Sequence, residues 1–490
     1  MGLMRFIFPP DRITDETVEQ AYLSGFDRIP WQVRVRRQDG ELVLERSASD
    51  SGALHVPWRV EGHGQVTLST ATLMERPEPY YLPLELARGK IGQVRKQLAE
   101  WAMNGLSVPR RVHDTLAEAL GFFAQAAVVE HRSSRSVKLA EEAVRLGLEA
   151  ANLLAASYAE QVLEVRRSPT QKPGGFWGVD LGLSLLDEQT AGQTVAAFNA
   201  ANVPLVWREI ETSEGHYGWD TTDKQVEWGR ARGLMLSAGP LLRFDQHSLP
   251  DWLALYENDF DGLLALASEF VKAAVRRYHG RINLWQCAGR VNSPDVLSMS
   301  EEEKVRLAAR AVEITRAIDA TTPLLVSFDQ PWAEYLSRRE MDFPPLHIAD
   351  ALVRANLGLS GLMLEINVGY HPGGTLSRDP LDFSQHLDYW NLLGVPLFVG
   401  LTVPSADGHD PLARRAARLP RQSWTPQAQE AWVARYLPLL LAKPYLHGVL
   451  WNQLRDFEPH DFAHGGLFDL RRQPKPVLRQ IAALRRAHLK

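Results

Sequence analysis

The sequence predicts an α/β protein, a (β/α)8 TIM barrel with an N-terminal β-sandwich-like domain and a helical connecting segment. Three observations lead to this prediction. The chain has 490 residues, which is too long for one ordinary hydrophobic core. Over residues 175–490, short apolar stretches alternate with amphipathic helical patterns. Residues 1–80 show the two-residue alternation of strands, and residues 81–167 show helical spacing.

The first 80 residues carry strand patterns that are separated by turns. Polar and apolar residues alternate over residues 31–36 and 41–45, and the turn signal Gln38-Asp39-Gly40 lies between them. Residues 54–60 and 65–73 supply further strands. The pattern indicates a small antiparallel sandwich.

Three helices are predicted next, over residues 84–101, 112–129 and 136–165, because apolar residues recur there at helical spacing. We expect these helices to pack between the sandwich and the barrel. Residues 168–175, SPTQKPGG, are rich in Pro and Gly and indicate a linker.

Eight strand–helix units follow the linker. The strand candidates are residues 176–181, 203–209, 235–242, 282–287, 324–328, 361–368, 397–401 and 448–452, with helices between them, for example over 190–201 and 300–318. A parallel barrel has a packed interior and binds its ligands on the loops after the strands. No Gly-rich phosphate loop follows any of these strands, so dinucleotide and nucleoside triphosphate chemistry are poorly supported.

Composition narrows the functional classes. Hydrophobic residues make up 45% and charged residues 23%, as in soluble globular proteins. The formal net charge of −5 gives no electrostatic case for nucleic-acid binding. With one cysteine, Cys287, neither an intrachain disulfide nor a cysteine-rich zinc site can form, and we expect Cys287 to be a small buried hydrophobe.

Targeting and metal signals are missing from the sequence. The N-terminus MGLMRFIFPPDR has too short an apolar run for a secretory signal, and no segment has the roughly 18 uninterrupted apolar residues of a membrane span. A cytoplasmic protein without a membrane partner is therefore expected, and export by a route without such a signal stays open. The histidines lack HExxH spacing, so we expect no catalytic metal and no cofactor.

The fourth strand candidate becomes polar where it leaves the barrel core. The segment RINLWQCAGRVN (281–292) opens apolar and then presents Gln286, Arg290 and Asn292. We expect these three side chains on the ligand-binding rim.

Several ordered motifs resemble one family. The segment WREIETSEGHYGWD (207–220), followed by Asp223, resembles the signature of retaining sugar hydrolases with barrel folds, with Thr212 in place of a proline. The segments GPLLRF (239–244) and LPDW (249–252), and later GVLWNQLRD (448–456), GGLFD (465–469) and PKP (474–476), are similar to motifs of glycoside hydrolase family ten, the xylanase family. This resemblance covers about residues 175–488. It implies a barrel that acts on carbohydrate and an N-terminal domain that is either a carbohydrate-binding or a plain packing module.

The departures from the family pattern fall on its working residues. Gly289 and Arg290 stand where the family has Asn and its general acid/base Glu, and residues 397–404 carry no acid where the family has its nucleophile. Val203 and Val206 replace the sugar-holding Asn and Lys, and the family's His falls near Gly239-Pro240. Arginine cannot donate a proton near neutral pH. The family's two-carboxylate mechanism therefore cannot be transferred residue by residue.

Other acids at strand ends are candidates for a relocated pair. Glu365 lies in an apolar run and needs a partner, because an unpaired buried charge costs several kcal/mol. We predict either a catalytic role as nucleophile or base, or an ion pair with an arginine such as Arg290. The proton donor would be Glu209 or Asp329, or else Asp180. Two further acids, Glu211 and Asp456, are expected in structural roles.

The residues predicted to bind the sugar share a place at or near a strand end and a polar or aromatic side chain. Sugar rings stack their C–H faces on aromatic rings, although core packing is the alternative for each tryptophan. They are Asp180, Trp207, Arg208, Trp285, Gln286, Arg290, Asn292, Gln330, Trp332, Tyr370, His371, Trp451 and Asn452.

Three functions fit this pattern. The first is a divergent glycoside hydrolase with a relocated carboxylate pair, which acts on an oligosaccharide or polysaccharide. The second is a non-catalytic saccharide-binding protein that kept the cleft and lost the acid/base and the nucleophile. The third is a barrel for an anionic sugar, whose carboxylate or sulfate would be bound by Arg208, Arg243 and Arg290.

Overall fold

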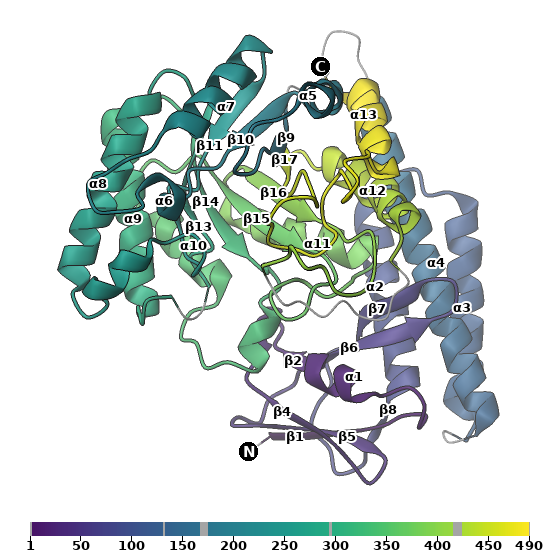
Figure 1. Ribbon diagram of the computed structural model, residues 1–490. Helices are drawn as coiled ribbons and strands as arrows, with labels where there is room; N and C mark the ends of the chain where they lie inside the picture. Colours follow the sequence, from purple (N-terminus) through teal and green to yellow (C-terminus); the bar gives the residue numbers. More distant parts are fainter. Residues whose placement is uncertain (1, 131–132, 167–174, 294–295, 415–423, 490) are drawn as a thin grey trace.

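The computed structural model contains a closed barrel of eight parallel strands (Figure 1). It describes all residues except 1, 131–132, 167–174, 294–295, 415–423 and 490. The strands are β9 (Phe176–Asp180), β10 (Ala200–Val203), β11 (Met235–Ala238), β13 (Leu284–Gly289), β14 (Leu324–Asp329), β15 (Gly361–Asn367), β16 (Leu397–Thr402) and β17 (Leu446–Trp451). Each pairs with the next, and β17 pairs with β9, which closes the barrel and confirms the predicted fold.

Helices follow the strands and cover the outside of the barrel (Figure 1). They are α5 (Glu188–Ala197), α7 (Asp220–Ala231), α8 (Phe260–Tyr278), α9 (Glu301–Ile318), α10 (Pro345–Arg354), α11 (Pro380–Trp390), α12 (Pro426–Ala442) and α13 (Pro476–His488). A capping box fixes the start of α9, where the Ser300 hydroxyl accepts from the Glu303 amide and the Glu303 carboxylate accepts from the Ser300 amide.

The predicted second strand, residues 203–209, was wrong. The strand β10 ends at Val203, and Trp207–Ile210 form the short helix α6. Pro204 has no N–H for a strand ladder, so the apolar run that starts at Val203 cannot continue the sheet. The small residues of β10 had been assigned to the preceding helix, which ends at Ala197.

The barrel interior changes from apolar to polar along the strands. One interior cluster is apolar and contains Phe176, Ala200, Leu284, Leu325, Met363, Phe398 and Leu450. Side chains two residues apart on a strand share a face. The interior positions that come two or four residues later are therefore Asp180, Asn202, Gln286, Ser327, Glu365, Gly400 and Asn452. A polar layer thus lies at the carboxyl end of the barrel, where the candidate site is found.

Two four-stranded sheets form the N-terminal part. One has the order β4-β5-β1-β8 and the other the order β3-β2-β6-β7. All neighbours are antiparallel except β1 and β8. The elements are β1 (Gly2–Ile7), α1 (Asp15–Gln20), β2 (Tyr22–Ser24), β3 (Pro30–Trp31), β4 (Arg34–Gln38), β5 (Glu41–Arg46), β6 (Ala53–Val60), β7 (Gly64–Ser69) and β8 (Tyr80–Tyr81). The sequence predicted β4 to β7 and missed β1, α1 and the short strands β2, β3 and β8.

Three long helices, α2 (Leu82–Met103), α3 (Arg110–Val128) and α4 (Ser134–Val165), match the predicted helices within a few residues. They share one apolar core with both small sheets and with Leu376 and Leu381 of the barrel region. Helix α4 also packs against α11 and α12 (Figure 1). Apart from Gly175, the predicted linker lies outside the described residues. Within the described chain, none of the helices has the length and apolar character that a membrane crossing requires.

Candidate functional site

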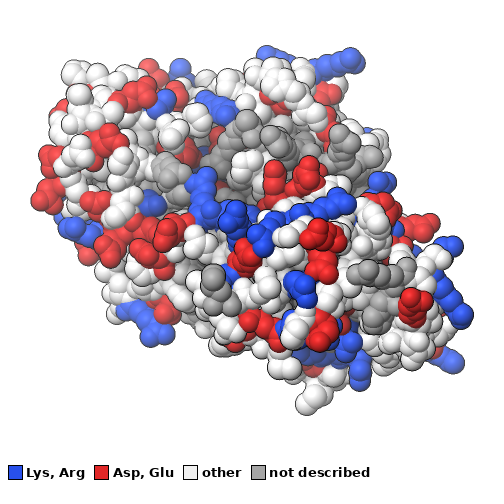
Figure 2. Space-filling model, turned by 90° about the horizontal axis from the view of Figure 1, so that it is seen from below, with Lys and Arg blue, Asp and Glu red and all other residues white. Residues whose placement is uncertain are grey.

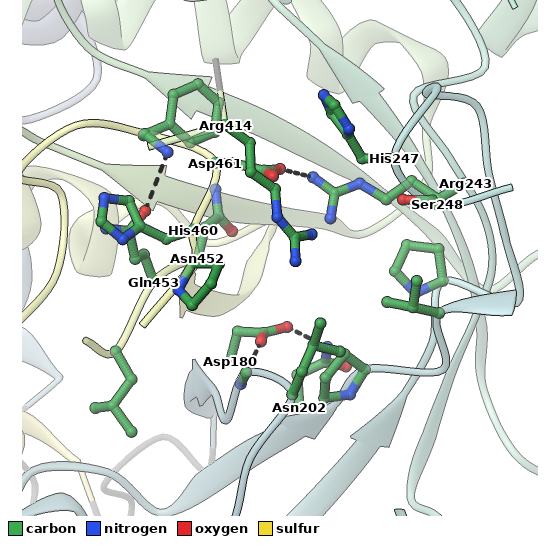
Figure 3. Close-up of a pocket in the computed structure, with 18 of the residues that line it drawn as sticks. Asp180, Asn202, Arg243, His247, Ser248, Arg414, Asn452, Gln453, His460 and Asp461 are labelled. Carbon is green, nitrogen blue, oxygen red and sulfur yellow. Dashed lines mark hydrogen bonds and ion pairs between the residues drawn. The ribbon is translucent and has the colours of Figure 1, made fainter. Parts of the chain in front are cut away.

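A cleft of about 450 Å³ opens at the carboxyl ends of the barrel strands (Figure 3). Its floor comes from β9, β10, β13 and β15, and its walls come from the loops after β11, β16 and β17. Polar side chains dominate the lining, and they include Asp180, Asn202, Arg243, His247, Gln286, Arg290, Glu365, Arg414, Asn452, His460 and Asp461.

Three side chains on the floor of the cleft, Asp180, Asn202 and Gln286, are joined by hydrogen bonds. The Asn202 Nδ2 donates to Asp180 Oδ2 at 2.7 Å, and the Gln286 Nε2 donates to Asn202 Oδ1 at 3.0 Å. The amide of Gly182 donates to the other Asp180 oxygen at 2.8 Å. Burial raises the pKa of Asp180 in spite of these donors. This part of the floor therefore presents acceptors and donors in an almost fixed arrangement.

Arg290 is the centre of a charge network. It leaves the end of β13 with a positive φ of 58°, and its side chain is 1% exposed. Its guanidinium contacts three carboxylates: Glu365 Oε2 at 2.9 Å, Asp245 Oδ2 at 3.2 Å and Asp461 Oδ2 at 3.4 Å. Arg243 pairs with the same Asp245 at 2.9 Å and also with Asp461. Two guanidiniums and three carboxylates are thus neutralised largely among themselves.

Both carboxylate oxygens of Glu365 are occupied. Arg290 Nε donates to one at 2.9 Å, and the Ser327 hydroxyl donates to the other at 2.7 Å. Burial alone would raise the pKa of Glu365, but Arg290 and Arg243, with the Ser327 hydrogen bond, hold it below its usual value. Glu365 is 6% exposed. The ion pair that was the structural alternative for Glu365 is therefore present.

Asp329 lies beside Glu365, because the two residues are register partners on β14 and β15. Burial raises the pKa of Asp329 to about 7; Arg290 opposes the shift, and the charge of Glu365 adds to it. The Asn367 amide donates to its Oδ1 at 3.1 Å. Asp329 does not line the first cleft but opens onto a neighbouring one.

Arg414 differs from the other cleft arginines. Its guanidinium extends into the cleft from the loop after β16 (Figure 3). In the described part of the chain, no hydrogen bond or ion pair engages this guanidinium. Its donors therefore face the space that a ligand would occupy.

On the outer surface, Figure 2 shows Lys and Arg gathered in a band across the middle of one face, with Asp and Glu beside it.

Several residues predicted to bind sugar lie in the core instead. Trp285, Trp451 and Tyr370 are buried, and their N–H or O–H groups donate to Asp319 (3.0 Å), the Gly465 carbonyl (3.0 Å) and the Ala463 carbonyl (2.8 Å). Trp285 and Trp451 neighbour Gln286 and Asn452 in sequence, so strand alternation turns them outward to the helices.

Other predicted positions are also committed to structure. Trp332 stacks on His386 at 4.2 Å, and the Asn292 amide donates to the Asp329 carbonyl at 2.8 Å. Arg208 pairs with Asp251 at 2.5 Å and binds nearby carbonyls. Trp207 reaches the cleft but is 3% exposed.

The remaining predicted residues reach a cleft. Glu209, Gln286, Arg290, Asn452 and Asp180 line the first cleft, whereas Gln330 and His371 line its neighbour. Two acids hold the structural roles expected of them. Glu211 accepts from the Trp207 indole at 2.6 Å, and Asp456 pairs with Lys475.

Sequence reasoning missed Asn202, His247, Arg414, His460 and Asp461. Asn202 was hidden because it lies between the helix predicted over residues 190–201 and the strand predicted over 203–209, whereas the structure places it on β10. The other four lie in long loops, where no periodic pattern marks a position. Among the described residues, no group of three or more His, Cys, Asp or Glu side chains is placed to hold a metal ion.

No protein-family model matches the chain. Among solved structures, it is similar to xylanase 10B from Thermotoga petrophila in complex with xylobiose, at 15% identity and a TM-score of 0.49, over 68% of this chain and 97% of that one. Native xylanase 10B from Thermotoga maritima is similar at 15% identity and a TM-score of 0.49, over 67% of this chain and 98% of that one. Native xylanase10C from Cellvibrio japonicus is similar at 17% identity and a TM-score of 0.47, over 64% of this chain and 70% of that one. These are xylanases, the class that the sequence motifs resemble.

Proposed function

We propose that the cleft binds a neutral saccharide and that Glu365 serves as a counter-ion of Arg290 rather than as a nucleophile. One observation carries this proposal: both Glu365 oxygens are held, at 2.9 Å by Arg290 and at 2.7 Å by Ser327. A carboxylate that is held by a buried guanidinium and a hydroxyl is restrained from approaching a sugar carbon, and its lowered pKa makes it a weaker base.

The cleft lining supports a polyhydroxylated ligand. Asp180, Asn202 and Asn452 alternate acceptors and donors along one side, and Arg414 supplies further donors from the opposite side (Figure 3). Leu183 adds apolar surface for C–H faces, whereas Leu454 and Phe462 are almost completely buried in the cleft lining. Arg208, Arg243 and Arg290, the arginines expected to bind an anionic sugar, are already paired with carboxylates, which leaves Arg414 as the guanidinium that faces the ligand.

Calorimetric titration with xylobiose, xylohexaose and cellohexaose, together with a reducing-sugar assay, tests the proposal. We expect binding of one sugar class without sugar release. Arg414→Ala should weaken binding about tenfold, because it removes charge-assisted hydrogen bonds. The control Arg354→Ala removes an exposed arginine of α10 and should bind like the wild type. Sugar release that disappears in a folded Glu365→Gln variant would contradict the proposal.

Hydrolysis is the second candidate function, because the cleft holds carboxyl groups whose pKa values are shifted in opposite directions. Burial raises the pKa of Asp180. Burial would also raise the pKa of Asp461, but the charges of Arg243 and Arg290 outweigh this effect and lower it to about 2. Such a split is what an acid and a carboxylate partner in glycoside hydrolysis require. Sugar release by the wild type that Asp180→Asn abolishes would favour this candidate, and release that Asp180→Asn leaves intact would exclude Asp180 as the acid.

A further inference from the structure

A second cleft of about 710 Å³ adjoins the first one at the barrel mouth. The two clefts share His247 and Arg414, which line both. We call the first one the inner cleft and the second one the outer cleft. The outer cleft is lined on the barrel side by Gln330, Tyr335, Arg338 and His371, and on the other side by Glu19 and Gln20 of the N-terminal helix α1.

Helix α1 is held at this cleft by Arg338, which follows the short helix η2 (Glu334–Ser337) of the barrel region. The Arg338 Nη2 donates to the carbonyls of Val18 at 2.8 Å and Ala21 at 3.0 Å. Its Nη1 donates to the Val33 carbonyl at 2.7 Å. A cation at the C-terminal carbonyls of a helix satisfies acceptors that have no partner within the helix. The position of Glu19 and Gln20 is therefore set by the barrel itself.

The outer cleft is lined by neutral polar side chains and by charges of both signs, among them Glu19, Arg339 and Arg414. Glu19 is exposed, and among the described residues its carboxylate makes no hydrogen bond or ion pair, although its charge opposes the lowering by burial of the pKa of Arg338 and of His371. The lining alternates amide, phenol, imidazole and carboxylate groups, which bind hydroxyls as donors or acceptors. Arg414 and His247 line both clefts, so a ligand that leaves the inner cleft beside them would reach the outer cleft.

From this geometry we infer that the N-terminal domain completes the ligand site: Glu19 of α1 and His371 of the barrel bind the part of an extended oligosaccharide that runs past Arg414 and His247 into the outer cleft. This inference rests on the proposed function, because it needs a saccharide in the inner cleft. It assigns the N-terminal part a direct role in selecting ligands by length. A sugar that fills the inner cleft alone would not contact it.

The test compares the affinities of xylobiose and xylohexaose by calorimetry in the full chain. We expect xylohexaose to bind more tightly, and the ratio of the two affinities to fall roughly fivefold in Glu19→Ala and in His371→Ala, since each loses a hydrogen bond to the longer sugar alone. The matched controls Glu118→Ala and His113→Ala change exposed residues of α3 and should keep the wild-type ratio.

Two results would overturn the inference, and they are distinguishable. If xylobiose binds in an Arg414-dependent manner but the ratio is unchanged in both outer-cleft variants, the inner cleft binds sugar and the inference alone fails. If neither xylobiose nor xylohexaose binds to the wild type, the proposed function fails for these sugars and takes the inference with it.

Discussion

Arg290 illustrates how one side chain decides the chemistry of the barrel mouth. Its guanidinium is almost completely buried and contacts Glu365, Asp245 and Asp461. Removing charges from water costs several kcal/mol per ion, and close pairing with additional hydrogen bonds offsets much of this cost. The acids that surround Arg290 therefore offset the cost of burying its charge, which leaves fewer of them for reaction with a substrate.

Asp329 is expected to make stability fall as the pH rises. Its pKa of about 7 in the folded protein lies above the value of about 3.9 for an unfolded chain. Between these values the folded state binds more protons, so the stability contributed by Asp329 is complete below about pH 4 and is lost as the pH rises through 7. The lowered pKa values of Glu365 and Asp461 have the opposite effect and remove stability as the pH falls.

Urea unfolding of Asp329→Asn at pH 5 and pH 8 checks this expectation. Relative to the wild type, the variant should gain about 2 kcal/mol in the free energy of unfolding between these pH values, because only the wild type must bury an ionised Asp329 at pH 8. The control Asp114→Asn removes an exposed carboxylate of α3, and its difference from the wild type should be the same at both pH values. An equal difference for Asp329→Asn would contradict the assignment.

At the scale of elements, strand register brings the polar layer together. Asp329, Glu365 and Gly400 are register partners on the adjacent strands β14, β15 and β16. A Cβ atom at Gly400 would lie 2.6 Å from Asn452 Oδ1, so the absence of a side chain there makes room for the Asn452 amide. The space beside Gly400 on β16 is thus filled by a side chain that follows the neighbouring strand β17.

The attachment of α1 to the barrel gives a prediction at the same scale. Arg338→Leu removes the donors to the Val18, Ala21 and Val33 carbonyls. We expect faster amide hydrogen exchange in residues 15–21 and unchanged exchange in the barrel strands, because short helices depend on tertiary contacts. Arg354→Leu on α10 is the control, since its arginine is exposed and pairs only with Asp350 among described residues. Unchanged exchange in α1 would show that Arg338 does not hold it.

At the scale of the whole molecule, the N-terminal part and the barrel are joined by buried polar contacts as well as by an apolar core. Lys90 of α2 and Asp379 at the start of α11 pair at 2.6 Å, and both side chains are 3% exposed. The Thr67 amide donates to the Ser377 carbonyl at 2.7 Å. Leu376 and Leu381 belong to the N-terminal core. We therefore expect the whole chain to unfold in one cooperative transition.

A double-mutant cycle on Lys90 and Asp379 tests this coupling. Each single change, Lys90→Met or Asp379→Asn, should cost about 3 kcal/mol, because it leaves a buried charge without its partner. The double variant should lose clearly less than the sum of both. The same cycle on the exposed pair Arg110–Asp114, at 93% and 67% exposure, should show coupling below about 0.5 kcal/mol. Two separate thermal transitions in the wild type would contradict the single cooperative unit.

Sequence patterns located the long helices α2, α3 and α4 and seven of the eight barrel strands, because apolar periodicity is a local property of the chain. The second strand failed, since β10 consists of small residues and the more apolar stretch after it contains Pro204. Of the predicted sugar-binding residues, Gln286, Arg290, Asn452 and Asp180 reach the inner cleft. Trp285 and Trp451 do not, because one residue of difference along a strand reverses the direction of a side chain. Tyr370, in the loop after β15, is buried and donates to the Ala463 carbonyl.

By itself, the sequence determined the barrel and its N-terminal sheets, since both can be read from residue types in order along the chain. Only the tertiary structure decided that Glu365 is held by Arg290 and that Arg414 reaches the cleft. Only the tertiary structure placed α1 at the rim of the outer cleft. These facts depend on contacts between residues far apart in sequence. The distances between side chains and their burial decide which groups pair and which reach a cleft, and the sequence pattern contains neither.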